Sequence, residues 1–181
     1  EYTTLAVVNF DANHNARYGF YRAADGAIEA ASAIAALPEK LDLYQIGGFC
    51  PIKPDEAATW LDIVDAAITR GATISIDPNV RPSLVDDFAG YKARLSRFLD
   101  LAHVVKVSEE DLAALDGAMT IEQHAAELLA RPNCQLVVVT LGEQGSRAFT
   151  AAGRASAAIY RPPVFGDTVG AGDSLMAGIL S

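Results

Sequence analysis

The chain contains 181 residues, enough for one domain with a hydrophobic core of ordinary size. Apolar residues make up 51% of it and charged residues 20%, a balance typical of a globular protein that dissolves in water. The formal net charge of −9 excludes an affinity based on neutralising a nucleic-acid backbone. No run of 18 apolar residues and no secretory signal occurs, so we expect a cytoplasmic protein that does not enter membranes.

The cysteines and the chain ends carry two further expectations. Cys50 and Cys134 belong to no metal-binding motif, which favours free thiols in a reducing cytosol over a disulfide. The sequence begins at Glu1, without Met, just before a strand-like run, and it stops at Ser181 inside a helical run. We therefore expect a piece of a longer protein.

The predicted elements begin with a hairpin and then alternate between helix and strand. Residues 3–10 are rich in β-branched side chains and residues 17–22 in aromatic ones, with a polar turn between them. Apolar residues recur with the helical period over 53–72, and 134–142 is an apolar strand of the kind buried on both faces. Further helices are expected at 27–37, at 87–101, after the SEED stretch at 108–111, at 120–131 and after 172. Ser108 with Asp111, and Thr120 with Gln123, resemble the capping boxes that open a helix. Further strands are expected at 41–49, 72–78 and 103–107, and a second hairpin at 146–151 and 154–160.

This alternation predicts an α/β fold with a mainly parallel sheet and right-handed crossovers. Ligands of such folds bind at the carboxyl ends of the strands. Polar or glycine clusters follow several predicted strands: Gly47–Gly48, Asp77–Arg81, Ser108–Asp111 and Thr140–Gly142. The sequence therefore predicts a single domain, 1–181, with a ligand site along one edge of the sheet.

The stretch FGDTVGAGDSL places Gly170, Ala171, Gly172 and Asp173 directly before an apolar helical run. Free N–H groups at a helix start bind anions, and glycines let the anion approach the backbone closely. The pattern matches neither GxxxxGK[ST] nor GxGxxG. Taken alone, it fits an anion-binding turn and a plain helix start equally well.

Asp173 favours the anion-binding interpretation, because a carboxylate repels phosphate unless it has a chemical task. That task is to accept a proton from a hydroxyl group that attacks a phosphoryl group, while the positive helix start stabilises the transferring charge. The alternative is an ordinary acidic residue favoured by the helix dipole.

The strand that ends at Thr140 leads into a second glycine-containing loop. Thr140 and Gly142 offer a hydroxyl group and an N–H group to nucleotide phosphates. Gly142 and Gly145 fit the turn of a hairpin equally well, which is the commoner use of such glycines. Both interpretations remain open for this loop.

Two other strand ends offer ligand-binding groups. Asn79 and Arg81 lie on a short proline-flanked turn that suits a grip on phosphate or on a sugar oxygen; the alternative is an Arg81–Asp77 pair that holds the loop. The acidic group 109–111 suits Mg²⁺ held through water, or the first turn of a solvated helix. The histidines share no spacing with cysteine or acidic partners and are expected as surface or strand residues.

Several motifs together resemble the ribokinase-like, or PfkB, family of carbohydrate kinases. DTVGAGD at 167–173 is similar to the C-terminal signature of that family, and VTLGEQG at 139–145 to its nucleotide loop. DPNVRPSL at 77–84 and FYR at 20–22 resemble its fructokinase and 2-keto-3-deoxygluconate kinase branch. The matches follow the family's order over nearly the whole chain.

The resemblance implies a three-layer α/β/α fold with a small β lid, to which the hairpin 3–22 would belong. It also implies transfer of the γ-phosphoryl group of ATP to a sugar hydroxyl, with Mg²⁺. Asp173 would be the base, and the N–H groups of Gly170, Ala171 and Gly172 would form the anion hole.

The resemblance assigns further roles residue by residue. The positions matching nucleotide contacts are Thr140, Gly142, Gly145, Lys106 and Ser108. The positions matching substrate contacts are Arg22, Asn79 and Arg81. The positions matching cation sites are Asp167 and Thr168 for a monovalent ion such as K⁺, and Glu110 and Asp111 for Mg²⁺; here SEED replaces the family's Asn-x-x-Glu stretch.

The leading hypothesis is a fructokinase-like enzyme. A 2-keto-3-deoxygluconate kinase comes second, since Arg17, Arg22 and Arg81 offer charges for a sugar acid. A non-catalytic sugar- or nucleotide-binding module and a structural domain are the hypotheses outside catalysis. The sequence lacks the family's N-terminal part with the sugar-binding Asp and the C-terminal part that covers adenine, so we expect an incomplete sugar site. The resemblance also leaves room for a homodimer through the lid.

Overall fold

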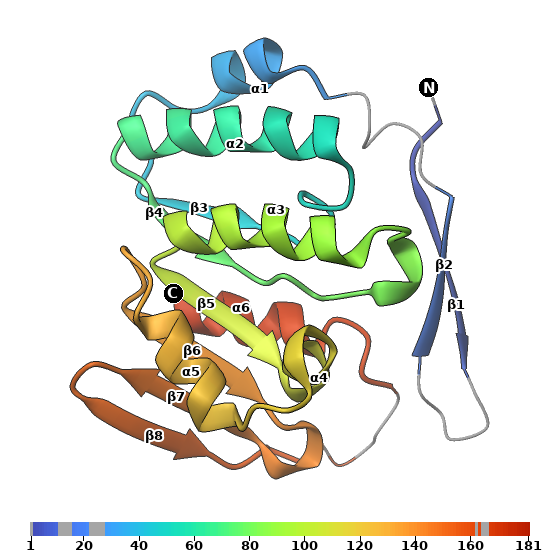
Figure 1. Ribbon diagram of the computed structural model, residues 1–181, viewed down its shortest axis with the longest axis vertical. Coiled ribbons are helices and arrows are strands. Elements are labelled where there is room, and N and C mark those ends of the chain that lie inside the picture. The colour runs from blue at the N-terminus through green and yellow to red at the C-terminus, as the bar shows by residue number, and fades with distance from the viewer. Residues whose placement is uncertain (1, 11–15, 22–27, 162, 164–166) are drawn as a thin grey trace.

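The computed structural model of the protein describes residues 2–10, 16–21, 28–161, 163 and 167–181. A six-stranded sheet with the strand order β3-β4-β5-β6-β7-β8 lies at its centre, and a two-stranded hairpin stands beside it (Figure 1). Strands β3 to β6 pair in parallel, and β7 and β8 add antiparallel neighbours at one edge. The predicted α/β fold with its parallel body of strands is confirmed.

The strands follow the predicted order along the chain. The hairpin consists of β1 (Leu5–Phe10) and β2 (Ala16–Tyr21). The parallel body consists of β3 (Leu43–Ile46), β4 (Thr73–Ile76), β5 (Val104–Ser108) and β6 (Leu136–Thr140). The second hairpin consists of β7 (Ser146–Thr150) and β8 (Gly153–Ala157).

The helices cover both faces of the sheet, which gives the three layers. They are α1 (Ala30–Ala36), α2 (Pro54–Thr69), α3 (Phe88–Leu101), α4 (Glu109–Asp116), α5 (Ile121–Leu129) and α6 (Ala171–Leu180). Helices α2 to α5 connect successive parallel neighbours, so right-handed crossovers place them on one face. Figure 1 shows α3 and α5 in front of the sheet and α6 behind it.

The core lies between the parallel strands and the helices in front of them. Val105 and Val139, on the central strands, are at most 1% exposed, and so are Tyr91 and Phe98 on α3. Side chains of this size each contribute roughly 1.5–3 kcal/mol when they leave water. Burial of these side chains therefore stabilises the strand body that carries the carboxyl edge.

The hairpin contacts the body next to the carboxyl end of β3. Its strands are antiparallel, with Leu5 opposite Tyr21. The ring of Phe20 packs edge-on against Phe49, with 4.9 Å between the ring centroids. Phe49 directly follows Gly47–Gly48, the predicted cluster after β3. The predicted hairpin is confirmed, and its use as a lid stays a prediction.

The predicted helix starts are also confirmed. Ser108 and Asp111 form a reciprocal capping box at α4, and Thr120 and Gln123 form one at α5. Asp87, expected as the first residue of the next helix, is the N-cap of α3, and its carboxylate accepts a hydrogen bond from the Gly90 N–H at 2.9 Å. Each box satisfies two N–H groups that the helix itself leaves unpaired.

The cysteines and the helix lengths bear on two further properties of the chain. Cys50 and Cys134 are not joined in a disulfide bond, as the sequence favours. Within the part of the chain that the structure describes, no helix has the length and apolar character needed to cross a bilayer.

Candidate active site

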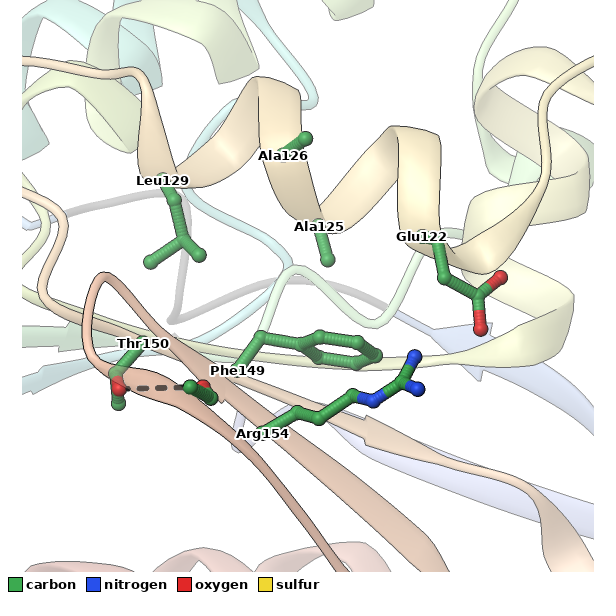
Figure 2. A pocket seen from close by; sticks show the side chains of 8 residues that line it. Glu122, Ala125, Ala126, Leu129, Phe149, Thr150 and Arg154 are labelled. Carbon is green, nitrogen blue, oxygen red and sulfur yellow. Dashed lines mark hydrogen bonds between the residues drawn. The ribbon is translucent and has the colours of Figure 1, made fainter.

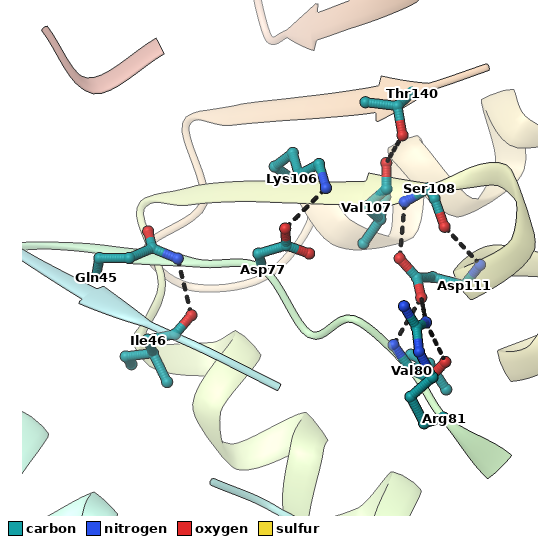
Figure 3. A network of polar contacts seen from close by, with 10 residues as sticks. All are labelled: Gln45, Ile46, Asp77, Val80, Arg81, Lys106, Val107, Ser108, Asp111 and Thr140. Atoms are coloured by element: carbon teal, nitrogen blue, oxygen red, sulfur yellow. Dashed lines mark hydrogen bonds and ion pairs between the residues drawn. The ribbon is translucent and has the colours of Figure 1, made fainter. Parts of the chain in front are cut away.

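The carboxyl ends of β4, β5 and β6 bring the predicted clusters to one edge of the sheet (Figure 3). Ser108 and Thr140 are register partners at the ends of β5 and β6, and Asp77 directly follows β4. The Thr140 hydroxyl group donates to the Val107 carbonyl at 3.5 Å. Parallel pairing therefore joins residues that lie far apart in the sequence.

The start of α6 has the backbone conformation that an anion-binding turn requires. Gly170 is the N-cap and has φ +79°, in the left-handed region that favours glycine. The Ala171 N–H donates to the Thr168 carbonyl at 3.1 Å and closes the turn. Among the described residues, no acceptor is found for the N–H groups of Gly170 and Gly172. The N–H groups of Gly170 and Gly172 are therefore available to an anion. The N–H group of Ala171, the third predicted donor, would first have to leave the Thr168 carbonyl.

Asp173 lies in the first turn of α6, and its side chain is exposed. A carboxylate in this place is stabilised by the helix dipole and remains accessible to an acceptor hydroxyl group. The exposure and the position of Asp173 therefore fit the predicted general base, and they equally fit an acidic residue that only interacts with the helix dipole.

Next to this turn lies a buried ion pair. Lys106 Nζ is 2.7 Å from Asp77 Oδ2, and the two side chains are 7% and 13% exposed. Burial raises the pKa of the Asp77 carboxyl above its usual range, and its hydrogen bond to the Lys106 ammonium offsets part of that rise. Among the residues that the structure describes, Asp77 Oδ1 is buried and has no hydrogen-bond partner. The sequence predicted neither this pair nor its burial, although a lone lysine inside an apolar strand was the available signal.

Asp111 forms hydrogen bonds with the segments at the carboxyl ends of β4 and β5. Its Oδ1 accepts from the Val80 N–H at 2.6 Å, and its Oδ2 accepts from the Ser108 N–H at 2.8 Å. The Arg81 guanidinium lies 4.0 Å from Oδ1. The structure thus pairs Asp77 with Lys106 and places Arg81 beside Asp111, so the alternative Arg81–Asp77 pair does not form.

The predicted cation ligands come from two elements of the described chain, the start of α4 and the turn before α6. Asp111 is 2% exposed and uses both oxygens inside the protein, whereas Glu110 is exposed in the first turn of α4. Asp167 Oδ1 accepts from the Val169 N–H at 2.9 Å, close to the exposed Thr168. No group of three potential metal-ligating side chains occurs among the described residues. Metal ligation by these four residues stays a prediction.

The glycine loop after β6 is part of a hairpin turn. Gly142 opens a short 3₁₀ turn, Gly142–Gln144, that connects β6 with the antiparallel β7, and it has φ +54°. Gly145 has φ +87°, and a Cβ there would collide with the Ala157 carbonyl. Gly145 is therefore required by the turn, whereas the space beside Gly142 is open. Nucleotide contacts by Thr140, Gly142 and Gly145 stay predictions.

Two of the three predicted substrate residues, Asn79 and Arg81, belong to the described part of the chain. Asn79 is exposed and has φ +42°, which is uncommon outside glycine and often marks functional loops. Arg81 is partly exposed beside it. Arg22 lies outside the described residues. Asn79 and Arg81 thus reach the same edge as Asp77.

A groove of about 390 Å³ lies elsewhere, between α5 and the β7–β8 hairpin (Figure 2). Its lining is mostly apolar: Leu129 extends from α5, Phe149 lies on the strand side, and Glu122 and Arg154 approach one end. None of the predicted site residues lines it. The edge of the sheet therefore remains the candidate site.

Comparison with known proteins decides the family. The family model described as "pfkB family carbohydrate kinase" matches residues 1–181. The chain belongs to this family. Its curated relatives include Fructokinase-1 of Oryza sativa subsp. japonica, 30% identical over 180 residues, and the fructokinase of Klebsiella pneumoniae, 32% identical over 186 residues. These alignments cover 98% and 99% of this chain but 55% and 58% of the relatives, so the chain spans about half of their length.

A solved structure of a fructokinase has the same fold as this chain. The fructokinase from Vibrio cholerae O395 in its fructose-, ADP- and calcium-bound form superposes with a TM-score of 0.77 at 26% identity. The superposition covers 97% of this chain and 57% of that protein. The ribokinase-like three-layer fold predicted from the sequence is confirmed.

Proposed function

We propose that the protein is an ATP-dependent sugar kinase, with fructose as its first candidate substrate. The open N–H groups beside the exposed Asp173 at the start of α6 carry this proposal, because they combine an anion site with a base. Membership of a carbohydrate kinase family and the fructokinase names of its relatives support the reaction and the sugar. Because the chain spans about half of these relatives, the activity is assigned to the full-length gene product.

The proposed reaction transfers one phosphoryl group. The sugar hydroxyl oxygen attacks the γ-phosphorus of ATP while its proton passes to the Asp173 carboxylate. The bond between that phosphorus and the bridging oxygen breaks, and ADP leaves. The N–H groups of Gly170 and Gly172, together with the positive end of α6, stabilise the charge on the transferring group.

Mg²⁺ would enter with the nucleotide, since it usually binds through substrate phosphates and one or two carboxylates. Glu110 fits this role on the described edge because its carboxylate is exposed, whereas Asp111 uses both oxygens in the protein. The ion would neutralise charge on the phosphates. Asp167 and Thr168 are the candidates for a monovalent ion such as K⁺, near the start of α6.

The first test is ADP release by the full-length gene product with Mg-ATP and a panel of sugars. The panel contains fructose, ribose, 2-keto-3-deoxygluconate and adenosine. Selective release with fructose supports the proposal, and selective release with the sugar acid supports the second substrate hypothesis. ATP binding without turnover on any sugar would instead identify a binding module and refute the kinase.

Replacing the base tests the mechanism. Asp173→Asn should lower kcat by about 10²–10⁴-fold, because that is the usual contribution of a general base. The matched control is Asp55→Asn, which neutralises an exposed acidic residue in the first turn of α2. Asp55→Asn changes the helix dipole interaction in the same way but should leave kcat unchanged. A loss below tenfold in Asp173→Asn would remove Asp173 from the base role.

A further inference from the structure

Tyr91, near the start of α3, carries a buried hydroxyl group that forms no hydrogen bond with any of the described residues. The residue is only 1% exposed. Its ring stacks on that of Phe88 with 5.6 Å between the ring centroids, so packing holds the phenol in the core. A buried unpaired polar group costs free energy, and a phenylalanine would fill the same space without that cost. The hydroxyl group therefore calls for a role beyond packing.

Two charged side chains at the edge of the sheet act on this hydroxyl group. Burial raises the pKa of the Tyr91 phenol, the Asp111 carboxylate raises it further, and the Arg81 guanidinium offsets part of the rise. The phenol therefore keeps its proton and offers an O–H donor. Asp111 is 2% exposed at the start of α4. A buried, negatively charged acceptor thus lies in the same region as the unpaired donor.

The Asp111 carboxylate has room for this donor. Its Oδ1 accepts from the Val80 N–H at 2.6 Å and lies 4.0 Å from the Arg81 guanidinium (Figure 3). Its Oδ2 accepts from the Ser108 N–H at 2.8 Å. An ionised carboxylate offers about four acceptor positions, so it can take a further donor. The nearby guanidinium balances its charge in the ligand-free protein.

Arg81 is the member of this group that a ligand can move. Its side chain is 38% exposed, whereas those of Asp111 and Tyr91 are buried. It lies two residues after Asn79, whose φ of +42° is of the kind that often marks functional loops. An oxygen-rich ligand competes with Asp111 for the guanidinium. Once the guanidinium turns toward a ligand, Asp111 is a buried charge with one compensating group fewer.

We propose that Tyr91 is a positioning residue of the substrate site: its hydroxyl group is unpaired in the ligand-free protein and donates to Asp111 when Arg81 turns to the bound sugar. The inference rests on the proposed kinase function and on contact between Arg81 and the sugar. The new hydrogen bond replaces the compensation that Asp111 loses, and it keeps Val80 and the 77–81 loop in place during binding. The hydroxyl group is thus unfavourable in the free protein and favourable in the complex.

Sugar affinity and the stability of the sugar-free protein separate this role from a packing role. Tyr91→Phe in the full-length gene product should raise the dissociation constant for fructose, measured by calorimetry, by about tenfold or more, because the complex loses a hydrogen bond to a charged acceptor. The urea midpoint of the sugar-free variant should stay or rise, because no bond is lost there. Tyr44→Phe is the matched control: it removes a hydroxyl group from a half-buried tyrosine on β3 and should leave the dissociation constant unchanged.

A second comparison tests the exchange without any ligand. Arg81→Met removes the guanidinium, so the Tyr91 hydroxyl group can donate to Asp111 in the free protein. In this background Tyr91→Phe should lower the urea midpoint, whereas in the wild-type background it should not. A hydroxyl group with a fixed structural partner would give the same loss in both backgrounds. One that never pairs would give no loss in either.

The possible results separate this inference from the function on which it rests. If the wild-type protein binds and phosphorylates fructose, an unchanged dissociation constant in Tyr91→Phe would overturn the inference alone. Equal effects of Tyr91→Phe on the urea midpoint in the two backgrounds would do the same. If Arg81→Met does not fold, the fructose affinity of Tyr91→Phe decides. A wild-type protein that binds no sugar of the panel would overturn the proposed function, and the inference with it.

Discussion

Gly48 shows how a single residue shapes the candidate site. A Cβ at this position would collide with the Pro78 carbonyl and approach the Asn79 Cβ to 3.1 Å, so the loop after β3 presses against the loop after β4. Both loops lie at the carboxyl edge of the sheet. Because the obstacle is backbone, it cannot rotate away as a flexible side chain would. The close contact fixes the loop that carries Asn79.

Adjacent glycines allow a controlled test of this contact. Gly48→Ala should destabilise the protein by about 1–3 kcal/mol, the usual cost of overpacking, and lower kcat by displacing the 77–81 loop. Gly47→Ala is the control, since nothing lies within 4 Å of its Cβ; we expect a change within about 0.5 kcal/mol. Urea unfolding and steady-state kinetics measure both effects. Equal stability of the two variants would contradict the close packing of the loops.

At the scale of elements, sequence reasoning succeeded where the signal was local. Local patterns in the sequence predicted the capping boxes of α4 and α5, the apolar strand β6 and the two hairpins. Each of these features depends on residues that are close together in the sequence. The contacts that shape the site are not local. Lys106 lies 29 residues from Asp77, and Asp111 lies 31 from Val80. Such partners become apparent only after the strands are paired.

The two capping boxes differ in a way that a pair of variants can measure. Asp111 and Gln123 both occupy the third position of a helix and both bond back to the N-cap residue. Asp111→Ala also leaves the buried Val80 N–H without its acceptor, and each buried unsatisfied group costs about 1–3 kcal/mol. We therefore expect Asp111→Ala to lower the free energy of unfolding by about 2–5 kcal/mol. Gln123→Ala, at an exposed box, should cost at most about 1 kcal/mol.

Chemical denaturation of both variants distinguishes a local cap from a long-range anchor. Similar losses would mean that Asp111 acts only as a cap and that the Val80 contact adds nothing. A large loss in Asp111→Ala would show that this buried carboxylate holds the 77–81 loop to α4, and would speak against its use as a metal ligand.

On the scale of the whole molecule, the β1–β2 hairpin presents an apolar face to solvent. Leu5, Val7 and Tyr21 are 57%, 37% and 69% exposed. Leu5 and Val7 are two residues apart on β1, and Tyr21 is the register partner of Leu5, so the three side chains share one face. Exposed apolar faces of this kind often mark protein interfaces. This supports the proposal of a homodimer through the hairpin.

Replacing one residue on each face of β1 tests that proposal. Leu5→Lys places a charge on the apolar face and should raise the dissociation constant of the dimer at least tenfold, about 1.4 kcal/mol. Ala6→Lys introduces the same charge at the adjacent exposed residue on the opposite face and should leave the constant unchanged. Sedimentation equilibrium of the full-length gene product measures both. A monomeric wild-type protein, or equal effects of the two variants, would exclude the hairpin face as the interface. A dimer weakened by Leu5→Lys alone would couple assembly to the position of the hairpin, which packs through Phe20 against Phe49 beside the carboxyl edge of the sheet.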